Sequence, residues 1–202
     1  MEEEYKWMLP ADVTFEKILA NTLISEHIQS HETITMLAVY YDTPDGLMHE
    51  LGGSLRFRRE NENAVCCMKI TREKQGACAL REEYEVQAEN MTVGLPMLKA
   101  AGAPAEVCDK IDAAHLCELC GTDYTRNAYL LEVSCNGSRF TAELALDSGL
   151  FCREGRSLTF SEAELEHKSG DAQAFHAFAK LLEYELKLIP QPLSKLARAL
   201  RV

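Results

Sequence analysis

The stretch Ser54–Ile70, SLRFRRENENAVCCMKI, decides the fold, because charged and apolar residues alternate on both sides of a polar turn. Successive side chains of a β-strand point to opposite faces, so residues of the same parity share a face. Arg56 and Arg58 therefore share one face, opposite a leucine and a phenylalanine. The polar residues 60–63 predict a turn between two strands, and Lys69 follows between two apolar neighbours.

The same alternation of charged residues recurs in further stretches, namely MEEEYKWML (1–9), LREEYEV (80–86), RFTAELALD (139–147) and SEAELEHK (161–168). Taken singly, each is typical of a half-solvated strand. Taken together, they carry pairs of like charges two residues apart, which repel unless counter-charges or metal ions lie between them. A sheet closed with these faces inward would place glutamates opposite arginines and lysines. Its apolar faces would then point outward, beneath amphipathic helices.

These patterns predict an α+β fold with one closed antiparallel sheet, a polar interior and flanking helices. Residues 1–202 are expected to form a single domain, since no linker or low-complexity run interrupts them. Helices are predicted at 14–30 with Thr14 as N-cap, twice within 91–116, and at 171–186 and 193–200. Further strands are predicted at 1–10, 33–43, 78–88 and within 120–151, where NGS and DSG are expected to divide them.

Composition narrows the classes of function. The net charge of −11 argues against a binder of nucleic acid polymers, whose footprint is basic. No apolar run reaches 18 residues and the acidic start is unlike a signal peptide, so a cytoplasmic protein without membrane attachment is expected. Cys67 is the inward member of the pair Cys66–Cys67, which makes it a candidate for oxidation. The sequence does not fix the oligomeric state, although a homodimer is a fair expectation.

The predicted interior combines two kinds of charge, and each kind selects a ligand. Carboxylates favour a hard divalent cation such as Mg²⁺ or Mn²⁺, which prefers oxygen ligands. Arginine and lysine favour phosphate oxygens. Both kinds together describe a polyphosphate bridged by metal ions, whose developing charge the site would neutralise during phosphoryl transfer.

Several segments resemble those of a known family. Glu2-x-Glu4-x-Lys6 resembles the ExExK signature of the CYTH, or triphosphate tunnel metalloenzyme, superfamily, which includes class IV adenylate cyclases, thiamine triphosphatases and bacterial inorganic triphosphatases. The segment 40–60 resembles the family's approach to its LRxR strand. The resemblance continues, in order, through CMKI (67–70), LREEYEV (80–86), TRNAY (125–129), EAELEHKSGD (162–171) and LSKLARAL (193–200), so it spans nearly the whole chain.

The resemblance implies an eight-stranded antiparallel barrel, a tunnel that holds the triphosphate. It implies metal ligands, for Mg²⁺ or Mn²⁺, at Glu2, Glu4, Glu164 and Glu166. Contacts to a triphosphate are implied for Lys6, Arg56, Arg58, Lys69, Arg126 and Lys195, and catalytic roles for Glu4, Lys69 and Glu85. Glu162 and Lys168 are interpreted as residues of the rim. The chain departs from the family at Tyr124, where many members have a second basic residue.

The function that follows is metal-dependent hydrolysis of inorganic triphosphate or a small organic triphosphate. One alternative is a class IV adenylate cyclase, which converts ATP to cyclic AMP and pyrophosphate. Another is a non-catalytic module that binds polyphosphate or nucleotides. An adenine-sized apolar pocket at one mouth of the tunnel would favour the cyclase over the hydrolase.

Overall fold

The structure of the chain is a computed structural model that describes residues 3–75, 78–135 and 137–202. These residues form nine β-strands: β1 Glu4–Met8, β2 Ile28–Asp42, β3 Ser54–Glu60, β4 Asn63–Gln75, β5 Cys78–Gln87, β6 Cys117–Cys135, β7 Ser138–Arg153, β8 Arg156–Gly170 and β9 Ile189–Pro190. Their helices are α1 Phe15–Ala20, α2 Thr22–Ser25, α3 Leu47–Glu50, α4 Met91–Ala100, α5 Ala105–Cys108, the 3₁₀ turn η1 Ala113–His115, α6 Ala172–Leu186 and α7 Lys195–Ala199.

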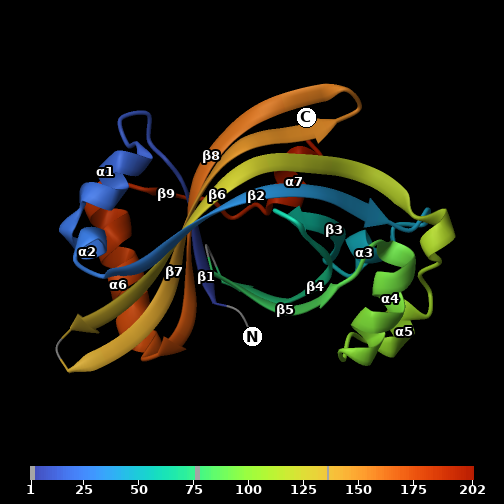
Figure 1. The fold of residues 1–202 in the computed structure, drawn as a ribbon, viewed down its shortest axis with the longest axis horizontal. Coiled ribbons are helices and arrows are strands. Elements are labelled where there is room, and N and C mark those ends of the chain that lie inside the picture. Colours follow the sequence, from blue (N-terminus) through green and yellow to red (C-terminus); the bar gives the residue numbers. More distant parts are fainter. Residues whose placement is uncertain (1–2, 76–77, 136) are drawn as a thin grey trace.

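The strands pair into one strongly curved antiparallel sheet, in the order β5-β4-β3-β2-β6-β7-β8-β1-β9 (Figure 1). The α+β class and the antiparallel sheet are thus confirmed, but the closed eight-stranded barrel is not. Within the described residues, β5 and β9 are the two edges of the hydrogen-bonded sheet. Strand β1 comes within 8 Å of β5 between Cα atoms, yet its backbone pairs with β8 and β9 instead.

The outer, apolar faces of the sheet lie under helices, as the alternation predicts. Helix α6 packs with α1 and α2 over β1, β6, β7 and β8, while α4 and α5 cover β4 and β5 at the opposite end (Figure 1). Trp7 is fully buried in the first of these layers, and its indole donates a 2.7 Å hydrogen bond to Glu183 of α6. None of the helices in the described ranges combines the length and apolarity needed to span a bilayer.

Two local predictions are wrong. The segment 14–30 is not one helix, because Asn21 ends α1 and caps α2 by accepting a hydrogen bond from the Leu23 amide. Strand β2 then begins at Ile28. The DSG sequence does not divide β7, which runs through it unbroken. Gly149 is instead a point of close approach, since a Cβ there would lie 2.4 Å from the Tyr124 Cα atom.

The other elements agree with the sequence to within a few residues. Three helices have N-caps whose side-chain oxygens accept hydrogen bonds from backbone amides: Thr14 for α1, Asp171 for α6 and Ser194 for α7. Strands β3 and β4 form the predicted hairpin, paired from Glu60 and Asn63 onward. Strands β6 and β7 form another hairpin.

Candidate active site

A cavity of about 440 Å³ is lined by residues of β1 to β8, of α7 and of the segment before it. Helix α7 lies on the concave side of the curved sheet (Figure 1). Its basic lining residues are Lys6, Arg56, Arg58, Lys69, Arg126, Lys168 and Lys195. Its acidic lining residues are Glu4, Glu60, Glu83, Glu85, Glu143, Glu164 and Glu166. The structure therefore brings together every site residue predicted from the sequence except Glu2, which lies outside the described residues.

One row of glutamates crosses three neighbouring strands on the cavity side. Glu4 of β1 is directly opposite Glu166 of β8, and Glu166 is directly opposite Glu143 of β7. Two cations contact this row: the Lys168 ammonium lies 2.8 Å from Glu166 and 3.8 Å from Glu143, and the Lys6 ammonium lies 3.5 Å from Glu4. Like charges placed directly opposite destabilise a sheet, so this row favours an additional positive charge in the cavity.

A second group lies on β3, β4 and β5. Glu83 contacts Lys69 at 2.5 Å and Arg56 at 3.3 Å, while Glu85 contacts Arg58 at 2.9 Å. The Nε atoms of both arginines are buried without a hydrogen-bond partner among the described residues. Buried donors without partners are unfavourable, so the two guanidinium groups are suited to donate hydrogen bonds to an anion in the cavity.

The third group lies beneath α7 and contains three carboxylates, Asp147, Glu162 and Glu164, with ligand atoms within 4.8 Å of one another. Arg126 donates two 2.8 Å hydrogen bonds to Asp147 and one of 2.6 Å to Glu164. The Lys195 ammonium contacts all three, at 2.8 Å from Asp147 and 3.0 Å from Glu164. These contacts fix the two basic side chains at one end of the cavity.

Electrostatics keep Glu164 and Lys195 of this third group charged. Burial alone would raise the pKa of Glu164, but the ammonium groups of Lys195 and Lys6 outweigh it and hold that pKa well below the ordinary value. Burial alone would lower the pKa of Lys195, but the three surrounding carboxylates hold it well above the ordinary value. Glu164 and Lys195 are therefore held as opposed full charges, which can exchange their partners for a metal ion and an anion.

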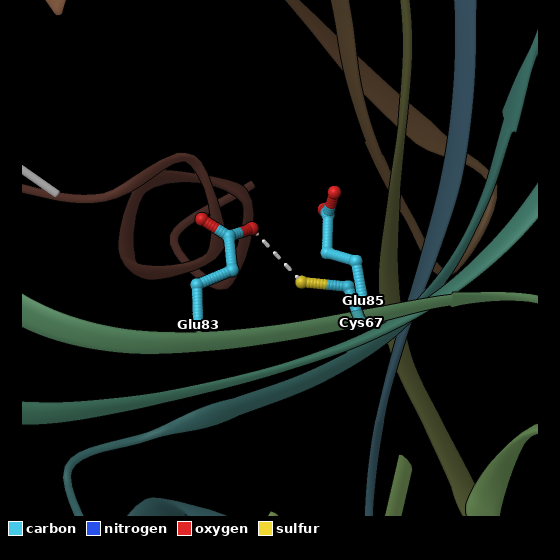
Figure 2. A group of neighbouring side chains, drawn as sticks. All are labelled: Cys67, Glu83 and Glu85. Carbon is cyan, nitrogen blue, oxygen red and sulfur yellow. Dashed lines mark hydrogen bonds between the residues drawn. The ribbon is translucent and has the colours of Figure 1, made fainter. Parts of the chain in front are cut away.

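Cys67 is the one soft ligand of the group on β4 and β5. Figure 2 shows its thiol directed at Glu83, with a sulfur–oxygen distance of 3.1 Å, and Glu85 beside them. The three side chains are close enough to share a metal ion. However, burial raises the pKa of Cys67 to about 12, so the group holds a protonated thiol at neutral pH. Because the thiolate is the reactive form, this disfavours the oxidation expected from the sequence.

Alkylation tests the state of this thiol. With iodoacetamide at pH 8, we expect the exposed Cys117 to be modified and the buried Cys67 to stay unmodified until the protein is denatured. Mass spectrometry of the peptides measures both sites in one sample, with Cys117 as the internal control. Modification of Cys67 as fast as that of Cys117 in the native protein would contradict the raised pKa.

Three residues of the site were misread or missed in the sequence. Glu162, interpreted as a rim residue, is fully buried, because Lys195 and Arg198 of α7 cover it. Asp147 shares the parity of Glu143, a signal that could have identified it. Arg198 forms an ion pair with Glu162, and only the course of α7 reveals it.

Tyr124 occupies the position at which a second basic residue was expected. The side chain lines the cavity and is only 5% exposed. The Lys195 ammonium lies over its ring at 5.2 Å from the centroid, within the range of a cation–π contact. Burial raises the pKa of the Tyr124 phenol, which therefore stays neutral. The aromatic ring thus faces the lysine, where a basic side chain would repel it.

Comparisons with known proteins agree with this geometry. The family model of the CYTH domain matches residues 1–200. An inorganic triphosphatase of Haemophilus influenzae is 26% identical over 172 residues, which cover 85% of this chain and 47% of that protein. The chain thus spans about half the length of this curated relative.

Solved structures show a similar fold. A Hippeastrum protein, described as a proposed adenylyl cyclase with a dominant triphosphatase activity, superposes with a TM-score of 0.67 at 20% identity, covering 100% of this chain and 95% of its own. The PH1819 protein of Pyrococcus horikoshii has a TM-score of 0.59 at 18% identity, covering 100% and 99%. A proposed adenylate cyclase of Bacillus halodurans has a TM-score of 0.52 at 18% identity, covering 95% of this chain and 92% of its own.

Proposed function

Because the chain belongs to the CYTH domain family, we propose that it is a metal-dependent triphosphatase, which hydrolyses inorganic triphosphate or a small organic triphosphate in the charged cavity. The observation that carries the proposal is the presence of cationic and carboxylate side chains on facing strands of one cavity. The inorganic triphosphatase activity named for the Haemophilus influenzae relative supports it. We further propose that the curved sheet acts as the wall of a tunnel around the substrate.

The basic residues are proposed to bind the phosphate oxygens. Arg56 and Arg58 offer the buried Nε donors that have no partner in the described structure. Lys6, Lys69, Arg126 and Lys195 supply further cations in the lining. All of them now hold carboxylates, so an entering polyphosphate would replace carboxylate oxygens with phosphate oxygens. Such fixed cations stabilise the negative charge that develops as the phosphoryl bond breaks.

The carboxylates fit a hard divalent cation. Glu4 and Glu166 are cross-strand neighbours in the glutamate row, and Glu164 lies opposite Lys6 one register step away. An all-oxygen donor set of this kind is preferred by Mg²⁺ and Mn²⁺. We propose that Glu4, Glu164 and Glu166, with Glu2, hold this ion. When bound, it would neutralise phosphate charge and increase the acidity of water.

The chain's own residues would then carry out hydrolysis as follows. Water attacks the terminal phosphorus, its P–O bond to the bridging oxygen breaks, and diphosphate and phosphate are the products. The proton of the water passes to a carboxylate, for which Glu4 and Glu85 are the candidates. Lys69, whose ammonium lies 2.5 Å from Glu83, is proposed to stabilise the oxygen that leaves. A single domain, a cytoplasmic location and a homodimer stay predictions from the sequence.

A substrate panel tests the function. The purified protein is incubated with inorganic triphosphate, thiamine triphosphate or ATP, with Mg²⁺, Mn²⁺ or EDTA, and phosphate, pyrophosphate and cyclic AMP are measured. We expect phosphate release from a triphosphate with either metal and none with EDTA. Cyclic AMP and pyrophosphate from ATP would favour the cyclase instead. Triphosphate binding without any turnover would identify a binding module and overturn the proposal.

A further inference from the structure

We propose that Arg198, a residue of α7 outside the cavity lining, positions Lys195 for contact with the polyphosphate, and that it acts through the carboxylate of Glu162. The proposal rests on the proposed function, because it concerns the same polyphosphate. Arg198 lies in the segment LSKLARAL (193–200), of which only Lys195 was given a site role from the sequence. The inference depends on three observations: the contacts of Arg198, the burial of Glu162 and the charge balance beneath α7.

Arg198 is fixed on two sides. Its Nη2 atom forms an ion pair with Glu162 Oε2, and only 12% of the side chain is exposed. The guanidinium lies 4.9 Å from the ring centroid of Phe151 and 5.7 Å from that of Phe160. These two rings stack on each other with centroids 4.2 Å apart. A guanidinium held by a buried carboxylate and by two aromatic rings has little freedom to move.

Glu162 connects Arg198 to Lys195. The carboxylate is fully buried, and its two oxygens hold different cations, Lys195 at Oε1 and Arg198 at Oε2. Both cations belong to α7 and are three positions apart, so they lie on the same side of that helix. One carboxylate thus sets the position of the helix and of the lysine that it carries into the cavity.

The charge balance gives Arg198 a second effect on Lys195. The acidic group beneath α7 consists of Asp147, Glu162 and Glu164, and Lys195 contacts all of its members. Arg198 neutralises part of this group, so that Lys195 need not compensate Glu162 alone. Without the guanidinium charge, the lysine would be held more strongly by carboxylates and would be less available to phosphate. The group would also attract a divalent cation more strongly.

Loss of Arg198 should weaken the binding of triphosphate and strengthen the binding of a divalent cation. These opposite changes distinguish a positioning role from a loss of folded protein. Arg198→Met keeps an unbranched, largely apolar side chain but removes the guanidinium and its charge. We expect it to raise the KM for inorganic triphosphate about 5- to 30-fold with a smaller change in kcat, and to tighten Mn²⁺ binding a few-fold. Electron paramagnetic resonance of free Mn²⁺ measures the binding without any turnover. Partial unfolding would weaken the binding of triphosphate and of Mn²⁺ alike.

Three further variants complete the experiment. Arg198→Lys keeps the charge and should restore most of the affinity for triphosphate. Arg201→Met removes an exposed arginine of the same C-terminal segment and should match the wild type. In a Lys195→Met background, Arg198→Met should not raise KM further, because its effect passes through the lysine.

Each result decides the proposal. KM and Mn²⁺ binding of Arg198→Met equal to those of Arg201→Met would overturn it, as would a full additional loss in the Lys195→Met background. A wild-type protein that hydrolyses no triphosphate would refute the proposed function alone. The Mn²⁺ measurement and the binding of unhydrolysed inorganic triphosphate would still report whether Arg198 acts on the carboxylates and on Lys195.

Discussion

Replacing Glu4 by glutamine is expected to lower kcat for triphosphate hydrolysis about 10²- to 10³-fold, while the protein stays folded. Glu4 lines the cavity and is directly opposite Glu166, so the amide would remove a charged oxygen from the proposed metal site. It would also remove a candidate acceptor for the proton of water. Initial rates over a range of Mg²⁺ or Mn²⁺ concentrations measure the loss and show whether more metal reverses it.

Glu3→Gln is the matched control for this variant. Glu3 is the preceding residue and points to the other face, where its carboxylate lies 3.5 Å from His176 of α6. The substitution is chemically identical and lies one residue away, yet we expect it to change kcat less than about threefold, because Glu3 does not line the cavity. Equal activities of the two variants would show that the charge of Glu4 has no special role.

Replacing Arg126 by methionine is expected to lower the free energy of unfolding at pH 7 by about 3–5 kcal/mol and to abolish most of the activity. Arg126 holds the fully buried Asp147 through two hydrogen bonds and Glu164 through a third. Its removal leaves buried carboxylates with fewer compensating charges. Denaturation by urea, followed by circular dichroism, measures the change in stability, and Arg139→Met, at an exposed arginine of β7, serves as the control.

The pH dependence of this loss has a definite sign. The pKa of Glu164 is depressed in the folded protein, partly by Arg126. Such a carboxyl contributes stability that is present above its unfolded pKa, about 4.3, and is lost as pH falls through its folded pKa. The variant has less of this contribution to lose. The difference in free energy of unfolding between the wild type and Arg126→Met should therefore be largest near pH 7 and should shrink below about pH 4. A difference that is constant with pH would contradict the electrostatic cause.

The inner face of the sheet could be predicted from the sequence, because parity in a strand depends only on local geometry. Lys6, Arg56 and Glu164 come from distant parts of the chain, yet each was assigned to the interior from its immediate neighbours. When hydrophobic and charged residues alternate with period two and one face of the strand is covered, only one orientation of the strand buries its hydrophobic residues.

The features that the sequence did not predict depend on contacts between elements. The burial of Glu162 depends on α7 lying across β8, and its parity alone is equally compatible with a solvated rim. The division of 14–30 depends on Asn21, whose side chain competes with the helix by capping the next one. The expected closure of the sheet depends on the pairing of β1, and the two residues of β9, Ile189 and Pro190, pair with it. Such contacts leave no periodic pattern.

Strand β1 carries Glu4 and Lys6, but the elements that hold it, β8, β9 and α6, come from the far end of the sequence. Trp7 and its hydrogen-bond acceptor Glu183 are 176 positions apart. The ribosome must therefore deliver the chain through β9 before β1 can pair on both of its edges, and pairings over such spans form slowly. Of the residues proposed to bind the metal and the phosphate, Glu4 and Lys6 are therefore synthesised before the elements that hold them. A chain released early from the ribosome would thus carry these charged side chains without a cavity to hold them.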